Sequence, residues 1–218
     1  MEFTPIINDE LAMFIYIPNI LTKNELLELT SWLHSLKYKG GNCISGKEIP
    51  REQLWFQENG HYFCNDWKIK YDRWESNNYE EILYKYQDKI NNIVTNKLAK
   101  YGVLSTKFNS CLINKYRNGM DSIRPHRDTS ESFGDYPTIA GLSFCAKRTI
   151  CIKKIANECY ETNSLKHDQN DTYNLNVELE DNSLFIMAGA SQKYFTHEIP
   201  KNQECKNERF SLTFREYI

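Results

Sequence analysis

The chain has 218 residues, of which 40% are hydrophobic and 26% are charged, with a formal net charge of −2 and a sequence isoelectric point near 6.2. These values are ordinary for a globular protein that is long enough to bury one substantial core. They exclude a single basic field over the whole surface, which marks many nucleic-acid-binding proteins.

Seven cysteines are present, an odd number with no CxxC pair, so neither a disulfide framework nor a zinc ribbon is expected. Reduced thiols indicate an intracellular protein, nuclear or cytoplasmic. The N-terminus has no basic segment and Pro18 breaks its apolar stretch, so we expect no signal peptide. No run of 18 apolar residues predicts a membrane span. We expect a monomer.

The first hundred residues predict one strand and two helices. Residues 12–18 form a short apolar run ended by proline, which is typical of a buried strand. Thr22 and Glu25 make a capping-box pattern, and apolar residues at helical spacing follow as far as Gly40-Gly41. A second helix is predicted from about residue 79 to 100. Residues 42–75, rich in aromatic side chains, are predicted to be irregular.

The second half of the chain predicts strands separated by polar turns. The expected strands are residues 108–116, 138–145, 148–155, 173–179, 183–188, 194–199 and 208–217. Residues 156–172 are polar without periodicity, which indicates an insertion loop. Helices followed by a run of strands favour an α+β fold with a sandwich or barrel core.

His126, Asp128 and His197 are candidate metal ligands. Residues i and i+2 of a strand share a face, so His126 and Asp128 can reach one ion, and His197 on a later strand can supply a third ligand. Two histidines and one carboxylate make the facial triad of non-haem Fe(II) oxygenases. From these residues alone, a purely structural role for both histidines stays open. A kinase interpretation of His-Arg-Asp fails because Phe133 replaces the expected Asn.

The predicted C-terminal strand alternates strictly. One face is apolar, and the other carries Arg209, Ser211, Thr213 and Arg215. A buried guanidinium is costly without an anion, and a dicarboxylate such as 2-oxoglutarate would supply one through bidentate bonds. The alternative is an edge strand with its arginines in water. Asn114 and Tyr116 share a face of another predicted strand and can donate to a carboxylate in the same way.

Several ordered motifs together resemble the AlkB family of Fe(II)- and 2-oxoglutarate-dependent dioxygenases. They are residues 108–119 (FNSCLINKYRNG), 121–128 (DSIRPHRD), 137–144 (PTIAGLSF), 184–192 (LFIMAGASQ), 197–200 (HEIP) and 209–215 (RFSLTFR). The resemblance covers roughly the C-terminal half. It implies one domain with a double-stranded β-helix, or jelly roll, in residues 105–218. Residues 1–104 would hold N-terminal helices and a nucleotide-recognition lid.

The resemblance also implies roles for individual residues. His126, Asp128 and His197 would bind Fe(II), while Asn114 and Tyr116 would hold 2-oxoglutarate. Arg209 and Arg215 would join them, with Arg209 on the distal carboxylate and Ser211 and Thr213 lining the same row. The implied reaction is oxidative demethylation of N-alkylated bases in DNA or RNA, releasing formaldehyde, succinate and CO₂.

The implied substrate site lies in the lid. Pro50-Arg51 resembles a family motif, and Trp55, Phe56 or Tyr62 would stack on a flipped base, although a core role for these aromatics stays equally open. Close relatives often carry an acid one or two places after the triad Asp. Here Thr129 and Ser130 occupy those places, and Glu131 is the nearest acid.

Two alternative functions remain open at the level of the sequence. The chain could be a related dioxygenase acting on protein or a small molecule, or a catalytically silent nucleic-acid-binding module. The run Lys68, Lys70 and Arg73, close to Trp67 and Trp74, is either a local basic surface for nucleic acid or a solvated face.

Overall fold

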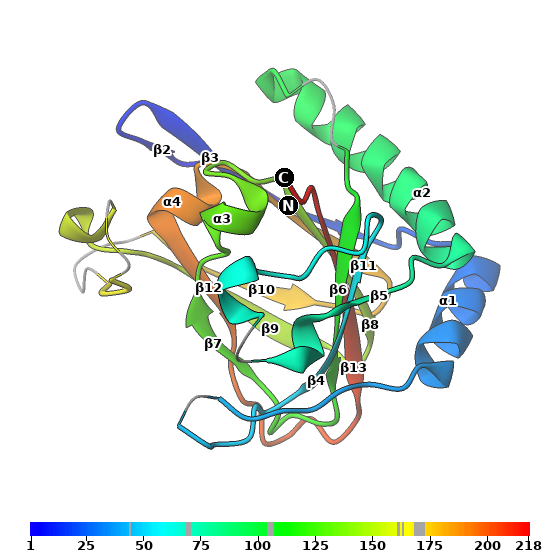
Figure 1. Ribbon diagram of the computed structural model, residues 1–218. Coiled ribbons are helices and arrows are strands. Elements are labelled where there is room, and N and C mark those ends of the chain that lie inside the picture. Colours follow the sequence, from blue (N-terminus) through cyan, green and yellow to red (C-terminus); the bar gives the residue numbers. More distant parts are fainter. Residues whose placement is uncertain (44, 69–70, 104–106, 161, 163, 168–172) are drawn as a thin grey trace.

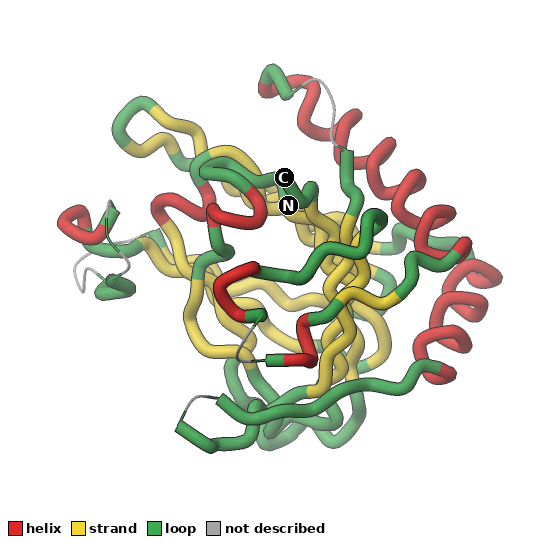
Figure 2. Tube along the Cα trace, viewed as in Figure 1, coloured by secondary structure: helices red, strands yellow, loops and turns green. Residues whose placement is uncertain are grey.

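The computed structural model describes the chain apart from residues 44, 69–70, 104–106, 161, 163 and 168–172. Two β-sheets face each other, and two long helices cover the outer face of the larger sheet (Figures 1 and 2). From Ser110 onward the described strands pass back and forth between the two sheets, except that Arg148–Lys154 and Asn174–Leu179 follow one another within the smaller sheet. This arrangement confirms the predicted α+β class with a jelly-roll core.

The larger sheet has the strand order β1-β3-β11-β8-β13-β6-β4-β5, with β2 paired to β3. Its strands are β1 (Glu2–Phe3), β2 (Ile6–Ile7), β3 (Glu10–Pro18), β4 (Glu52–Gln57), β5 (Ser76–Asn77), β6 (Ser110–Tyr116), β8 (Ile139–Cys145), β11 (Ser183–Gly189) and β13 (Arg209–Arg215). Neighbouring strands are antiparallel, except that β4 and β5 are parallel. Strands from both halves of the chain therefore build this sheet.

The smaller sheet has the order β10-β9-β12-β7 and is antiparallel throughout. Its strands are β7 (Ile123–His126), β9 (Arg148–Lys154), β10 (Asn174–Leu179) and β12 (Phe195–Ile199). One buried cluster fills the space between the sheets, and it includes Phe14, Ile152, Phe185 and Phe195. Because apolar side chains fill only part of that space, the polar faces of β6, β7, β12 and β13 can meet in a cavity.

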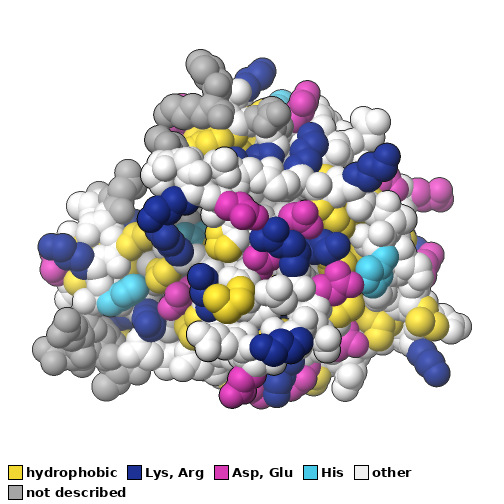
Figure 3. Space-filling model, turned by 90° about the horizontal axis from the view of Figure 1, so that it is seen from below, with side chains coloured by type: hydrophobic (Ala, Val, Ile, Leu, Met, Phe, Trp, Pro, Cys, Tyr) yellow, Lys and Arg dark blue, Asp and Glu magenta, His cyan; other side chains and the backbone are white. Residues whose placement is uncertain are grey.

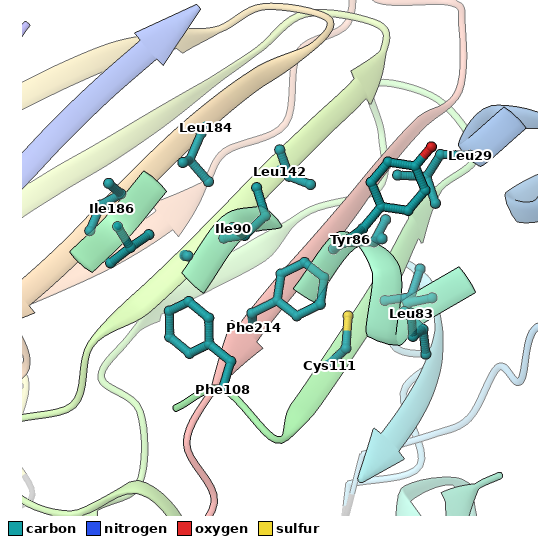
Figure 4. Close-up of a cluster of buried hydrophobic side chains, with 14 of the residues drawn as sticks. Leu29, Leu83, Tyr86, Ile90, Phe108, Cys111, Leu142, Leu184, Ile186 and Phe214 are labelled. Carbon is teal, nitrogen blue, oxygen red and sulfur yellow. The ribbon is translucent and has the colours of Figure 1, made fainter. Parts of the chain in front are cut away.

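Helices α1 (Lys23–Ser35) and α2 (Glu81–Leu98) pack on the other face of the larger sheet. The close-up shows side chains of both helices against those of the strands, including Leu29, Ile90, Leu142 and Phe214 (Figure 4). Thr22 and Glu25 form the predicted capping box at the start of α1. The helix ends at Ser35, before the predicted stop at Gly40-Gly41, because the chain after Leu36 becomes extended.

The stretch 42–75 was wrongly predicted to be irregular throughout, since β4 lies inside it and pairs with β6. Short helices complete the fold: η1 (Asn65–Trp67), η2 (Asp72–Trp74), η3 (Ala99–Tyr101), α3 (Ser130–Phe133), η4 (Asn157–Cys159) and α4 (Ser191–Tyr194). In the predicted insertion 156–172, η4 and a bridge between Ile155 and His167 are described, whereas residues 161, 163 and 168–172 lie outside the description.

All seven cysteines are free thiols. Among the residues that the structure describes, none of the helices is long and apolar enough to cross a membrane. The nucleotide-recognition lid expected within residues 1–104 stays a prediction.

Candidate active site

A cavity of about 230 Å³ opens between the two sheets. One wall comes from β6, β8 and β13 of the larger sheet, and the facing wall comes from β7 and β12. Three aromatic side chains from the 58–75 segment close a third side: Phe63, Trp67 and Trp74. The cavity therefore collects polar residues of both sheets beside an aromatic wall.

The pairing of β7 with β12 brings His126 and His197 together. The two histidines are register partners, and their ring centroids lie 4.1 Å apart. Asp128 follows two residues after His126, and its Oδ1 lies 4.0 Å from His126 Nε2. One ligand atom from each of the three side chains lies within 4.8 Å of the others, so all three can reach one metal ion.

Both imidazoles are held in the neutral form that a metal requires. Desolvation by the surrounding protein lowers the pKa of His126 below its ordinary value and lowers that of His197 to about 3. His126 Nδ1 donates a hydrogen bond to the Arg124 carbonyl at 2.9 Å, which leaves the lone pair on Nε2. The donor set of the site therefore suits a divalent cation such as Fe(II).

Asp128 is fixed by two further residues. Arg215 Nε donates to its Oδ2 at 2.5 Å, and the Asp128 backbone N–H donates to Gln192 Oε1 at 2.9 Å. Burial is the largest single influence on the pKa of Asp128 and raises it, but the charge and hydrogen bond of Arg215, together with the two neighbouring histidines, outweigh burial and the pKa is lowered. The carboxylate is therefore ionised and held in place.

A row of polar side chains crosses the larger sheet on its cavity face. Strand register places Gln53 opposite Asn114, Asn114 opposite Ser211, and Ser211 opposite Ser143. The Asn114 side-chain oxygen accepts bonds from Gln53 Nε2 at 2.9 Å and from Arg51 Nε at 3.0 Å. Because that oxygen already accepts two hydrogen bonds, the N–H groups of the Asn114 amide on Nδ2 are available to donate toward the cavity.

Arg209 is buried at the end of this row. Its Nη2 donates to Ser143 Oγ at 2.8 Å, and its guanidinium lies 5.2 Å from the centroid of the Tyr116 ring. Among the described residues, its Nε and Nη1 have no hydrogen-bond partner. Buried donors without partners are costly, and a carboxylate of a bound diacid would satisfy them. The residues present therefore fit 2-oxoglutarate.

The two arginines of β13 have different surroundings. The predicted alternation of the strand is present, since Arg209, Ser211, Thr213 and Arg215 all line the cavity while Phe210, Leu212 and Phe214 are buried on the helix side. Arg215, however, is already paired with Asp128. Arg215 is thus held by the triad, whereas Arg209 has N–H donors on Nε and Nη1 without a hydrogen-bond partner in the described chain.

The aromatic residues proposed for stacking lie elsewhere. Trp55 is fully buried behind Phe63, and Phe56 packs against Trp32 on the helix side. Tyr62 packs beside the Trp55 cluster, outside the cavity lining. The structure therefore does not support stacking by Trp55 or Phe56.

Arg51 lines the cavity as expected, whereas Glu131 is exposed outside its lining and accepts a hydrogen bond from Cys64 Sγ at 3.3 Å.

The 68–73 run does not form one solvated face. Arg73 is buried, with its guanidinium 4.3 Å from the Tyr71 ring centroid and 5.3 Å from that of Trp74. Lys68 is exposed, and Lys70 lies outside the described residues. Of this basic run, Arg73 therefore supports the aromatic wall of the cavity from behind.

Sequence reasoning missed much of the rest of the cavity and its support, including the polar and aromatic residues Gln53, Phe63, Trp67, Trp74, Ser143 and Gln192. Of these, Ser143 carries a signal in the sequence, since Leu142 and Phe144 on either side of it mark the other face of β8 as apolar. The others become visible only through contacts between distant segments.

Comparisons with known proteins agree with this geometry. A family model described as the 2OG-Fe(II) oxygenase superfamily matches residues 13–215. The human alpha-ketoglutarate-dependent dioxygenase alkB homolog 3 is 39% identical over 108 residues, which cover 50% of this chain and 36% of that protein. The Arabidopsis thaliana DNA oxidative demethylase ALKBH2 is 30% identical over 128 residues, covering 54% of this chain and 40% of that protein.

The chain thus matches well under half the length of these curated relatives. Among solved structures, OsALKBH1 superposes with a TM-score of 0.65 at 12% identity, over 93% of this chain and 97% of that one. A prolyl hydroxylase from Trichoplax adhaerens, solved with a peptide fragment of hypoxia inducible factor, gives a TM-score of 0.53 at 13% identity, over 94% and 83%. At these identities the two structures show the shared fold alone.

Proposed function

Because the chain belongs to the 2OG-Fe(II) oxygenase superfamily, and within it to the AlkB family, we propose that it demethylates N-alkylated bases of DNA or RNA by oxidation. The cofactors of this superfamily are Fe(II) and 2-oxoglutarate. The observation that carries the proposal is the convergence of His126, Asp128 and His197 in the cavity that Arg209 also lines. Arg209 is buried, and its Nε and Nη1 have no hydrogen-bond partner within the described part of the chain.

In this proposal, His126, Asp128 and His197 hold the iron. Bound Fe(II), with 2-oxoglutarate and O₂, supplies the oxidising chemistry that hydroxylates the N-methyl group, and the hydroxymethyl product breaks down to formaldehyde and the free base. Arg215 and Gln192 keep Asp128 oriented, so that the carboxylate needs no reorganisation when the metal binds.

2-Oxoglutarate would lie along the polar row of the larger sheet. Arg209 is assigned to its distal carboxylate, since Nε and Nη1 are buried and need an acceptor. Asn114 Nδ2 and the Tyr116 hydroxyl are further donors on the same wall, and Ser211 and Thr213 leave room there because they are small. Arg215 already pairs with Asp128, so its main assigned role is to hold that carboxylate, and binding of 2-oxoglutarate is a secondary role.

The aromatic wall supports a nucleobase as the substrate. Phe63, Trp67 and Trp74 line the cavity, and a base must leave its stack to reach a buried metal. On the face seen in Figure 3, basic and acidic side chains are interspersed rather than separated. Because the chain has a formal net charge of −2, we expect recognition to depend on the pocket more than on a broad basic surface.

Two other functions would use the same cavity. A dioxygenase acting on a protein side chain or small molecule would need the same triad and Arg209, and would differ only in what occupies the aromatic side. A catalytically silent binding module would have no use for a neutral imidazole pair beside an ionised carboxylate.

The test is formaldehyde release from methylated oligonucleotides, single- and double-stranded, incubated with Fe(II), O₂ and 2-oxoglutarate. We expect formaldehyde in proportion to succinate, and neither product from the unmethylated oligonucleotide beyond the uncoupled background. Succinate without formaldehyde from any methylated oligonucleotide would favour another substrate class. No succinate under any condition would favour the silent module.

A further inference from the structure

The charged lining of the cavity carries a large positive excess. It consists of four arginines and one carboxylate: Arg51, Arg127, Arg209, Arg215 and Asp128. Arginine stays protonated in proteins, so each of the four arginines contributes one positive charge to the lining. Fe(II) and 2-oxoglutarate carry equal and opposite charges, so loading the site leaves the excess of three positive charges unchanged.

The lining offers a cationic substrate no free counter-ion. Asp128, the one acid of the lining, gives Oδ2 to Arg215, and its Oδ1 belongs to the proposed metal site. Glu131, the nearest acid after it in the sequence, is exposed outside the lining and accepts from Cys64. A positively charged base would therefore enter a cavity whose only carboxylate is already engaged.

Cation–π attraction to the aromatic wall does not compensate for the missing counter-ion. Trp74 is covered on one side by the Arg73 guanidinium, 5.3 Å from the ring centroid, and it stacks with Phe63 at 4.5 Å. A second cation brought to this wall would be repelled by the first, whereas a neutral base loses nothing by stacking there.

Two polar groups of the cavity lining, on Arg51 and Thr129, are suited to bind a carbonyl oxygen of a substrate. Arg51 uses Nε on Asn114 and Nη1 on the Ser122 carbonyl, while Nη2 has no hydrogen-bond partner among the described residues. The Thr129 hydroxyl, on the lining near Asp128, likewise takes part in no hydrogen bond of the described chain. Both groups can donate to a carbonyl of a bound base.

Building on the proposed function, we propose that this site prefers neutral N-alkylated bases that carry a ring carbonyl over cationic ones. Neutral examples are 3-methylthymine and 1-methylguanine, and cationic examples are 1-methyladenine and 3-methylcytosine. Thr129, which stands directly after the triad carboxylate, is the residue that leaves the cavity without an acid to offset a cation.

The experiment compares four single-stranded oligonucleotides of one sequence, each carrying one of these bases. Formaldehyde release gives kcat/KM with the Fe(II)- and 2-oxoglutarate-loaded protein, and fluorescence anisotropy without O₂ gives the affinity. We expect kcat/KM for the neutral bases to exceed that for the cationic bases by at least about tenfold, with the same order in affinity.

A matched pair of variants tests the electrostatic cause. T129D places a charge beside the bound base, and T129N has nearly the same shape without the charge. We expect T129D to shift the neutral-to-cationic ratio by about tenfold toward the cationic bases, and T129N to leave the ratio close to that of the unchanged protein. Because the readout is a ratio within each variant, a general loss of activity does not mimic the result.

Equal or higher kcat/KM for the cationic bases in the unchanged protein would overturn the preference while leaving demethylation in place. Equal shifts of the ratio in T129D and T129N would overturn the electrostatic cause. Release of formaldehyde from none of the four oligonucleotides would instead overturn the proposed function, and this inference with it.

Discussion

Asp128 joins the two sheets through an ion pair between side chains. It follows β7 of the smaller sheet, and Arg215 reaches it from β13 of the larger sheet. Both side chains are almost completely buried, so neither charge has water as an alternative partner. The metal site and the last strand of the fold are therefore coupled through one ion pair.

Asp128→Asn tests the ligand role with little change in shape. We expect loss of tight Mn(II) or Fe(II) binding and of turnover, because the amide lacks the charge that a divalent cation needs. Titration of metal under argon, with circular dichroism to verify folding, measures this outcome. His34→Ala is the control, since His34 is exposed, lies on the helix side of β13 and does not line the cavity. Full metal affinity in Asp128→Asn would refute the assignment of the triad.

Arg209→Gln tests the place of the diacid. We expect its dissociation constant for 2-oxoglutarate to rise at least about tenfold, because one charge-assisted pair is worth roughly 1.5–3 kcal/mol. Calorimetric titration of the Mn(II)-loaded protein without O₂ gives this constant directly. Arg124→Gln, at an exposed arginine of β7, should leave it unchanged. An unchanged constant in Arg209→Gln would show that the diacid binds elsewhere.

Gln192 is expected to act as a positioning residue. Its Oε1 accepts the Asp128 backbone N–H, so Gln192→Met should weaken metal affinity by about tenfold without removing a ligand. The same argon titration measures this, with Gln203→Met at an exposed position as the control. If metal affinity in Gln192→Met equals that of the control, the contact only supports the local fold.

At the scale of single elements, the alternation of polar and apolar residues along a strand predicted which side chains face the cavity. In β13, four polar and three apolar side chains point to opposite faces as the sequence indicates, because a half-polar strand can lie only one way between a cavity and a core. β4 was missed because its apolar residues face two different clusters, Phe56 toward the helices and Trp55 toward Phe63. A strand buried on both faces has no alternation to read.

Helices α1 and α2 are joined by an ionic contact that makes a pH-dependent contribution to stability. The hydrogen bond from Lys89, at 2.7 Å, and the backbone of Thr22 lower the pKa of Glu25 to about 2. A carboxylate with a lowered pKa stabilises the fold above its unfolded pKa, and this contribution is lost as the pH falls from about 4.5 to about 2.

Glu25→Gln keeps an acceptor for the Thr22 N–H but removes the charge. We expect it to cost at most about 1 kcal/mol at neutral pH, since both side chains of the pair are partly exposed. We further expect this cost to vanish as the pH falls through the window. Urea unfolding at several pH values measures it, with Glu204→Gln at an exposed position as the control. A cost that stayed constant down to pH 2 would assign the effect to packing.

At the scale of the whole molecule, the sequence predicted the triad better than the substrate wall. His126, His197 and Arg209 stand on strands whose pairing fixes where they point, and Asp128 follows β7 two residues after His126. Phe63, Trp67 and Trp74 instead reach the cavity because the 58–75 segment folds back on β4 and β6, and nothing local distinguishes them from Trp55. Which aromatic side chain faces a cavity is decided by long-range packing.

Because the proposed ligands come from both sheets, loading the site should stabilise the molecule as a unit. Mn(II) with 2-oxoglutarate would bridge His126 and His197 of the smaller sheet to Arg209 of the larger one. A ligand at 100 times its dissociation constant adds about 2.7 kcal/mol. For a domain of this size, that is a rise in Tm of roughly 5–11 °C.

Thermal unfolding without O₂ measures this rise, and Asp128→Asn is the matched control. We expect the full rise in the unchanged protein and little in Asp128→Asn, because the variant keeps the fold but cannot hold the metal that orients the diacid. Arg209→Gln should keep the part of the rise that Mn(II) gives alone and lose the increment from 2-oxoglutarate. An equal rise in all three proteins would mean that the metal and the diacid bind outside the cavity.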